Sequence, residues 1–237
     1  MQFIDPRVDI AFKKIFGNEN AQEILIDFLN AILNLQGMYK IKKASLLNPY
    51  QAPKIKYTKR SYLDVKCIDH RDIHYVVEMQ IEYVAGFKKR IIYNASKGYV
   101  NQIEKGEDYP RLNQVISINI LDFKMFDFEH YLSIHKTQEQ ITGDSYLDEI
   151  RYYFIELPKF NLEENELKSN LEKWVFFIKK TGNLDHIPKA LDTEIFKQAF
   201  EIAKKMNMTK EEWEEYDRES MLIQDEKGYY EGGYERG

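Results

Sequence analysis

Cysteine is almost missing from this chain of 237 residues, and proline and glycine are sparse. Because Cys67 is the only cysteine, the chain cannot form an intramolecular disulfide, and no cysteine cluster can hold zinc. The simplest interpretation of Cys67 is a small, buried apolar side chain. The 6 prolines and 11 glycines are too few for a fibrous or low-complexity chain.

Long apolar runs are missing as well. No stretch approaches the roughly 18 uncharged apolar residues that a membrane-spanning helix needs. The opening MQFIDPRVDIAFKK lacks the apolar segment of a secretory signal. Together with the lone cysteine, these absences favour a cytoplasmic protein that has no membrane partner.

The motifs of several common enzyme classes are also absent. The sequence contains no GxxxxGK(S/T) phosphate loop, no GxGxxG after a strand, no GxSxG elbow and no HExxH. These absences argue against P-loop nucleotide hydrolases, Rossmann oxidoreductases, α/β-hydrolases and HExxH metalloproteases.

Positive and negative charges are distributed unevenly along the chain. The composition, 43% hydrophobic and 31% charged, is that of a soluble globular protein. Residues 1–125 hold 19 Lys and Arg against 14 Asp and Glu, whereas the remaining residues hold 15 against 25. The basic residues gather in segments 40–43, 54–60 and 87–90. A basic first half suits a phosphate-rich partner such as DNA, although an ordinary solvated surface also accounts for the charges.

Hydrophobic periodicity predicts a mixed α/β core followed by helices. Apolar residues at helical spacing indicate six helices, over 6–16, 20–33, 86–106, 163–181, 192–206 and 209–224. Runs rich in β-formers indicate four strands, over 62–68, 73–81, 113–123 and 151–160. We therefore expect a core domain over 1–160, an acidic helical portion over 161–225 and a Gly-rich polar tail over 226–237.

Two acidic residues lie on the predicted strands that flank the polar turn at 70–72. Reflection through the centre of this turn, near residue 71, places Asp64 opposite Glu78, and such side chains come within about 5 Å when they share a face. Glu78 stands in the apolar run VVEMQ, where a carboxylate is costly unless it is paired, hydrogen-bonded or bound to a metal. Two adjacent carboxylates repel each other unless a positive charge lies between them.

A divalent cation such as Mg²⁺ or Mn²⁺ suits this pair, because it takes one or two carboxylates together with waters and substrate phosphates. Gln80 lies two residues beyond Glu78 and hence on the same strand face. Its amide could orient a water molecule or contact a phosphate oxygen. The spacing alone favours a surface hairpin that carries cross-strand polar pairs, although the apolar setting of Glu78 argues against it.

Several segments match one known family in the same order along the chain. They are DIAFKKIFGN (9–18), FLNAIL (28–33), YLDVKCID (62–69), YVVEMQ (75–80), RIIYNASKGYVNQIEKGEDYPRLNQVISINILDF (90–123) and FIELPKF (154–160). Through them the chain resembles the recombination-promoting nuclease and transposase family of the PD-(D/E)XK nuclease superfamily. The resemblance covers most of residues 5–160. It implies an α/β fold with a restriction-endonuclease-like mixed central sheet flanked by helices and a helical C-terminal portion.

The resemblance also implies a Mg²⁺-dependent DNA endonuclease, linked to recombination or transposition. By position, Asp64 and Glu78 would be catalytic metal ligands, and Met79 would add its backbone carbonyl. Gln80 falls where the superfamily usually has a lysine, which leaves the catalytic rate open. Since no motif reads base edges, we expect low sequence specificity.

Further residues gain roles from the same match. Asp9 would be an outer or second-metal partner, although an acid there also complements a helix dipole. Gln102 would support the site from the third helix, unless it caps or packs that helix. Arg90 could hold a phosphate with two hydrogen bonds. The basic segments would bind flanking phosphates through Lys56, Arg60, Lys88, Lys89 and Arg90.

Two other functions stay open from the sequence alone. A chain that keeps the nuclease fold with weak or no catalysis would act in DNA docking or assembly, and the missing lysine at position 80 favours this alternative. The acidic helical portion could instead be a dimerisation or a regulatory element, and in the first case the protein would be a homodimer.

Overall fold

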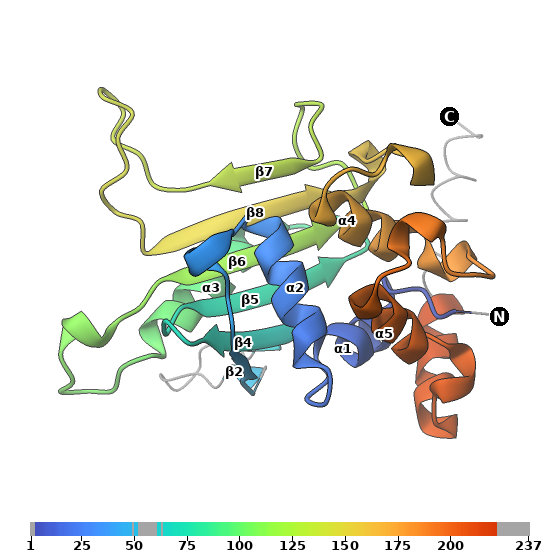
Figure 1. The fold of residues 1–237 in the computed structure, drawn as a ribbon. Coiled ribbons are helices and arrows are strands. Elements are labelled where there is room, and N and C mark those ends of the chain that lie inside the picture. The colour runs from blue at the N-terminus through green and yellow to red at the C-terminus, as the bar shows by residue number, and fades with distance from the viewer. Residues whose placement is uncertain (1–2, 49, 52–60, 63, 222–237) are drawn as a thin grey trace.

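The computed structural model describes residues 3–48, 50–51, 61–62 and 64–221. A six-stranded mixed sheet has the strand order β1-β4-β5-β6-β8-β7 (Figure 1). Its strands are β1 (Ala44–Leu46), β4 (Val65–Asp69), β5 (His74–Gln80), β6 (Val115–Leu121), β7 (Leu132–His135) and β8 (Ile150–Glu156). A separate antiparallel pair consists of β2 (Tyr50–Gln51) and β3 (Ser61–Tyr62).

The three strands β5, β6 and β8 are parallel, and the strands outside them run antiparallel to their neighbours. All seven residues of β6 are buried, as expected for a strand that is covered on both faces. Hydrophobic periodicity did not predict β7, because this edge strand has only four residues and only one of them is buried.

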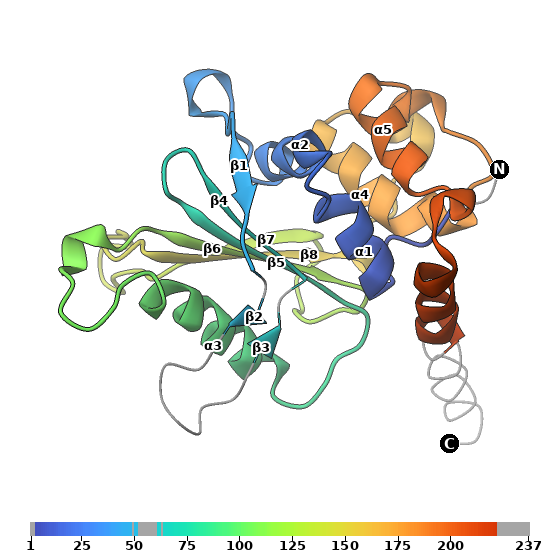
Figure 2. The same cartoon turned by 90° about the horizontal axis from the view of Figure 1, so that it is seen from below.

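Helices cover both faces of the sheet (Figure 2). One face carries α1 (Asp9–Phe16), α2 (Gln22–Ile32), α4 (Asn170–Lys180) and α5 (Glu194–Ile202), and the other carries α3 (Phe87–Val100). A further helix over 210–221 follows α5. The predicted mixed sheet flanked by helices is confirmed. Among the described residues, no helix is long and apolar enough to cross a bilayer.

The main hydrophobic core lies between the sheet and the four helices on one face. The predicted apolar stripe of α2 is buried there, through Ile24, Leu25, Phe28, Leu29 and Ile32. Trp174 of α4 lies edge-on to Phe28, with 5.9 Å between the ring centroids, and its Nε1 donates to Asp27 Oδ2 at 2.8 Å. The N-terminal helices and the helices after the sheet therefore share one core.

Two helices begin later than predicted, for local reasons. The Asp5 carboxylate accepts a hydrogen bond from the Arg7 backbone N–H at 2.9 Å and shapes a turn, so α1 starts only at Asp9. The Ser169 hydroxyl accepts from the Glu172 N–H at 3.1 Å, which caps α4 and makes residues 163–169 a separate segment. α5 and the helix over 210–221 lie within their predicted ranges.

The β4–β5 hairpin has a symmetric register about residue 71. Val65 lies opposite Val77, and Cys67 lies opposite Tyr75. Cys67 is fully buried, as expected, and burial raises the pKa of its thiol to about 12. The pairing follows directly from the polar turn that the sequence predicts.

A buried carboxylate holds the turn of this hairpin. Asp69 accepts hydrogen bonds from the Arg71 backbone N–H at 2.8 Å, from Arg71 Nε at 2.9 Å and from the Tyr75 hydroxyl at 2.9 Å. Burial by itself would raise the pKa of Asp69, but these hydrogen bonds outweigh it, and the pKa lies below its ordinary value. The ionised carboxylate therefore stabilises the hairpin.

Asp69→Asn should lower the free energy of unfolding by about 2 kcal/mol at pH 7, because the amide leaves some of these donors unpaired. A carboxylate whose pKa is lower in the folded state than in the unfolded state stabilises the fold at pH values above its unfolded pKa of about 4. This stabilisation is lost as the pH falls through the pKa of the folded state. Urea denaturation should therefore show a smaller difference between parent and variant at pH 3. The exposed Glu149 provides a control in Glu149→Gln. A difference that is unchanged between the two pH values would contradict the assignment.

Candidate functional site

Acidic residues gather at the end of the sheet where β5 finishes and β4 begins. Because the two strands are antiparallel, Asp64, which directly precedes β4, lies beside the last residues of β5. The register of the two strands ends at the Val65–Val77 pair. Asp64 turns towards α1 while Glu78 turns towards α3, so the predicted pairing of the two acids on one face is wrong. The start of α1 reaches the same end of the sheet (Figure 1).

The Asp64 carboxylate turns towards the backbone of β5. Its Oδ2 accepts a hydrogen bond from the Met79 N–H at 2.6 Å. In a β-strand, the N–H and C=O of one residue point to the same neighbouring strand. The carbonyl of Ile73, which directly precedes β5, accepts a hydrogen bond from the Asp69 N–H of β4. Every second residue from Ile73 to Met79 therefore points its backbone groups towards β4. The Met79 carbonyl therefore opens on the same side as the Asp64 carboxylate.

Asp9, the first residue of α1, brings a second carboxylate to Asp64. Lys13 Nζ lies 2.6 Å from Asp9 Oδ2 and 3.9 Å from Asp64 Oδ1. Burial, followed by the charge of Asp9, raises the pKa of Asp64 well above its ordinary value, although the Met79 N–H and Lys13 oppose the shift. Asp9 Oδ1 is buried and makes no hydrogen bond within the described part of the chain. One lysine therefore leaves this pair of acids only partly neutralised.

Glu78 lies on the other face of the sheet, beneath α3. Its side chain is 7% exposed, and its Oε1 accepts a hydrogen bond from Asn94 Nδ2 at 2.7 Å. Burial raises the pKa of Glu78, whereas Asn94 and the charge of Arg90 lower it. The sequence analysis missed Asn94, and the available signal was a polar residue on the same helical stripe as the buried Ile91 and Ala95.

The Gln80 amide is held at both ends. Its Nε2 donates to the Glu82 carbonyl at 2.9 Å, and its Oε1 accepts from Arg90 Nη2. The Arg90 guanidinium also lies 5.0 Å from the centroid of the Phe87 ring. Gln80 therefore fixes an arginine beside Glu78, at the place where a lysine at position 80 would have supplied positive charge.

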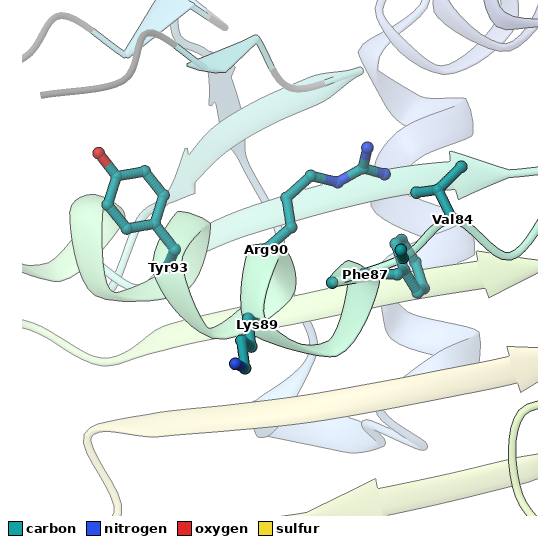
Figure 3. A pocket seen from close by; sticks show the side chains of 7 residues that line it. Val84, Phe87, Lys89, Arg90 and Tyr93 are labelled. Atoms are coloured by element: carbon teal, nitrogen blue, oxygen red, sulfur yellow. The ribbon is translucent and has the colours of Figure 1, made fainter.

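A pocket of about 620 Å³ opens beside Arg90, at the start of α3 (Figure 3). It is lined by Val84, Ala85, Gly86, Phe87, Lys89, Arg90 and Tyr93. Lys88 and Lys89 are exposed in the first turn of α3, which holds no acidic residue. Since the helix dipole is positive at this end, the basic side chains add to a potential that attracts anions.

One of the predicted residues, Gln102, does not join this group. The Gln102 amide bonds the Asn113 carbonyl at 2.8 Å and the Asn113 N–H at 2.7 Å. Asn113 precedes β6, at the opposite end of the sheet from Glu78, so the expected place of Gln102 in the site is wrong. These two hydrogen bonds hold the chain that follows α3, which ends at Val100 instead of the predicted residue 106. Lys56 and Arg60 lie outside the described residues.

The oxygen atoms at this end of the sheet fit a hard divalent cation such as Mg²⁺, which usually takes one or two carboxylates from the protein. Asp9 and Asp64 face each other, and the buried Asp9 Oδ1 has an unused acceptor position. The Met79 carbonyl opens beside them. The described residues contain no group of three His, Cys, Asp or Glu side chains arranged for a metal. The donor set is therefore the Asp9–Asp64 carboxylate pair with the Met79 carbonyl, while Glu78 lies on the other face of the same sheet end.

A mixed sheet with helices on both faces and acidic residues at one end is consistent with a PD-(D/E)XK α/β fold. The chain belongs to the PD-(D/E)XK nuclease family transposases, since the model of that family matches residues 6–233. The match extends beyond the nuclease-like segments into the helix over 210–221. Comparison with curated proteins gives no match, and neither does comparison with solved structures.

Asn94→Ala should lower the free energy of unfolding by about 1–3 kcal/mol, because Glu78 stays buried and loses a hydrogen-bond donor. In a Glu78→Gln background the loss of unfolding free energy should be clearly smaller, since the side chain at position 78 then carries no buried charge that needs a hydrogen-bond donor. Urea denaturation of the four proteins in EDTA completes the double-mutant cycle. Asn165→Ala, on an exposed turn, is the matched control. Equal losses in both backgrounds would show that Asn94 does not act through Glu78.

Proposed function

We propose that this protein is an endonuclease that uses a divalent metal ion to hydrolyse DNA phosphodiester bonds with low sequence specificity. The observation that carries the proposal is the pair of facing carboxylates, Asp9 and Asp64, at the end of the sheet where β5 carries Glu78 on its other face. Membership of a nuclease and transposase family supports a role in DNA cleavage or transposition.

Asp64 and Glu78 would hold the cation, with Asp9 and the Met79 carbonyl as further donors. When bound, a divalent cation polarises the phosphoryl oxygen and lowers the pKa of a coordinated water, which makes a nucleophile available near neutral pH. Lys13 keeps an ammonium group beside these acids, so an approaching phosphate meets a positive charge there. The two faces of the sheet would thus contribute different ligands.

Arg90 would bind a phosphate oxygen in place of the usual lysine. Its planar guanidinium can donate two parallel hydrogen bonds to a phosphate, and Gln80 holds it in position. Lys88 and Lys89 would contact neighbouring phosphates, which gives affinity without sequence information.

A second candidate function is DNA binding by the same fold with little or no cleavage. The observation that favours it is the Gln80 amide, which is engaged with Arg90 and the Glu82 carbonyl and so does not present both of its groups to a water. Cleavage that depends on the metal ion separates the two functions.

Supercoiled plasmid should be nicked in Mg²⁺ or Mn²⁺, and EDTA should abolish the reaction. Asp64→Asn and Glu78→Gln should each reduce the rate at least about 100-fold, because each removes a charged ligand from a site that depends on charge stabilisation. Glu149→Gln, an exposed acid before β8 at the opposite end of the sheet, should cut like the parent. Isothermal titration with Mn²⁺ provides a readout besides activity, and both site variants should bind the metal more weakly. Parent and variants that bind DNA but are equally inert would favour the second function.

Arg90→Gln should weaken DNA binding by a similar factor for unrelated sequences. It should also lower the slope of log K against log salt by about 1, because one phosphate contact is lost. Fluorescence anisotropy over a range of salt concentrations measures both effects. Lys210→Gln, an exposed lysine in the acidic C-terminal portion, should leave the slope unchanged. A slope that Arg90→Gln does not alter would remove Arg90 from the DNA contact.

A further inference from the structure

The pocket at the start of α3 combines apolar surface with positive charge. Val84 and Tyr93 supply exposed apolar surface, and Lys89 and Arg90 supply the cations (Figure 3). Its volume of about 620 Å³ lies within the range of roughly 300–1,000 Å³ that is usual for pockets of small organic ligands. Hydrolysis of a phosphodiester needs the cations but gives no reason for the apolar lining.

Aromatic rings stand exposed in and beside this pocket. Tyr93 is 36% exposed, and Tyr83, next to the lining residue Val84, is 53% exposed. Tyr83 is nevertheless held in place, because its ring lies edge-on to Phe87 at 6.4 Å and to Phe123 at 5.7 Å between centroids. Ordered aromatic rings that are partly exposed can serve as platforms for a flat ligand.

Cations surround these rings. Lys88, Lys89 and Arg90 are consecutive in the first turn of α3, and Lys97 Nζ lies 5.5 Å from the centroid of the Tyr93 ring. Aromatic rings interleaved with Lys and Arg are the usual means of binding single-stranded nucleic acid, because each base offers a π face and each nucleotide a phosphate. The cations therefore attract a polyanion, and the rings favour a polyanion that carries planar groups.

We propose that this pocket receives an unpaired nucleotide, and that the preferred substrate of the proposed nuclease is DNA with a single-stranded segment next to the duplex. A base inside a duplex is stacked and paired, so only an unpaired base can present its face to Tyr93. Arg90 joins the pocket to the acidic residues, since it lines the pocket and is bound by Gln80, two residues beyond Glu78. The cleavage part of this inference rests on the proposed function, whereas the binding part does not.

Fluorescence anisotropy in EDTA tests the binding part without cleavage. The probes are a blunt duplex, the same duplex with a single-stranded tail, and the tail alone. A tail should tighten binding by about 5- to 150-fold, the value of one base stacked on an aromatic ring. Tyr93→Ala should remove most of this gain and leave the blunt duplex almost unaffected, while Tyr93→Phe should keep it. Tyr109→Ala, a more exposed tyrosine past the far end of α3, is the matched control.

Equal affinity for blunt and tailed duplexes would overturn the proposal that the pocket receives an unpaired nucleotide. Equal losses of affinity for tailed DNA in Tyr93→Ala and Tyr109→Ala would overturn it as well. Cleavage of the same DNAs in Mg²⁺ is measured separately. Preferential binding of tailed DNA without any cleavage would leave the pocket intact and reject the nuclease. Cleavage of blunt and tailed DNA at the same rate, with equal binding, would keep the nuclease and reject the pocket.

Discussion

The hydrogen bond from the Met79 N–H to Asp64 Oδ2 determines the arrangement of the acidic residues. It ties the residue before β4 to the end of β5, so the Asp64 carboxylate lies at this end of the sheet. There it meets Asp9 of α1, while Glu78 stays beneath α3. The acids therefore approach the end of the sheet from both faces. A phosphate would be bound at this end only if α1 and α3 are both held in register with β5.

Contacts from distant parts of the chain hold α1 in that position. The N-cap residue of α1, Val8, offers no side-chain acceptor, and Glu219 of the helix over 210–221 accepts from the Ile10 N–H at 3.2 Å instead. Glu212 of the same helix pairs with Lys14 at 2.6 Å. Part of the acidity of the C-terminal portion is therefore used in docking against α1. This portion is thus physically coupled to the position of Asp9, whatever further role it has.

Local patterns were sufficient to predict the features that depend on neighbours in the sequence. The apolar stripe of α2 and the symmetric turn at 70–72 define a buried face and a register, and both agree with the structure. Features that depend on partners far along the chain could not be predicted in this way. The amide of Gln102 is bound by the Asn113 backbone, and the amide of Asn94 by Glu78, but both look alike in the sequence: a polar residue on an amphipathic helix. Only the tertiary pairing separates the structural amide from the one beside the acidic residues.

The amide at position 80 has a physical consequence that a lysine would not have. Arg90 Nη2 donates to Gln80 Oε1, a contact that two cations could not make without strong repulsion. Arginine has five N–H donors, so one bond to Gln80 leaves donors for a phosphate, while Phe87 supports one side of the guanidinium. With glutamine at position 80, the positive charge beside Glu78 comes from α3 and lies on a planar group. The same arginine lines the pocket at the start of α3. One residue would therefore position both a bound phosphate and the unpaired base beside it. Recognition of the single strand would in this way be coupled to the placement of its phosphate at the carboxylates.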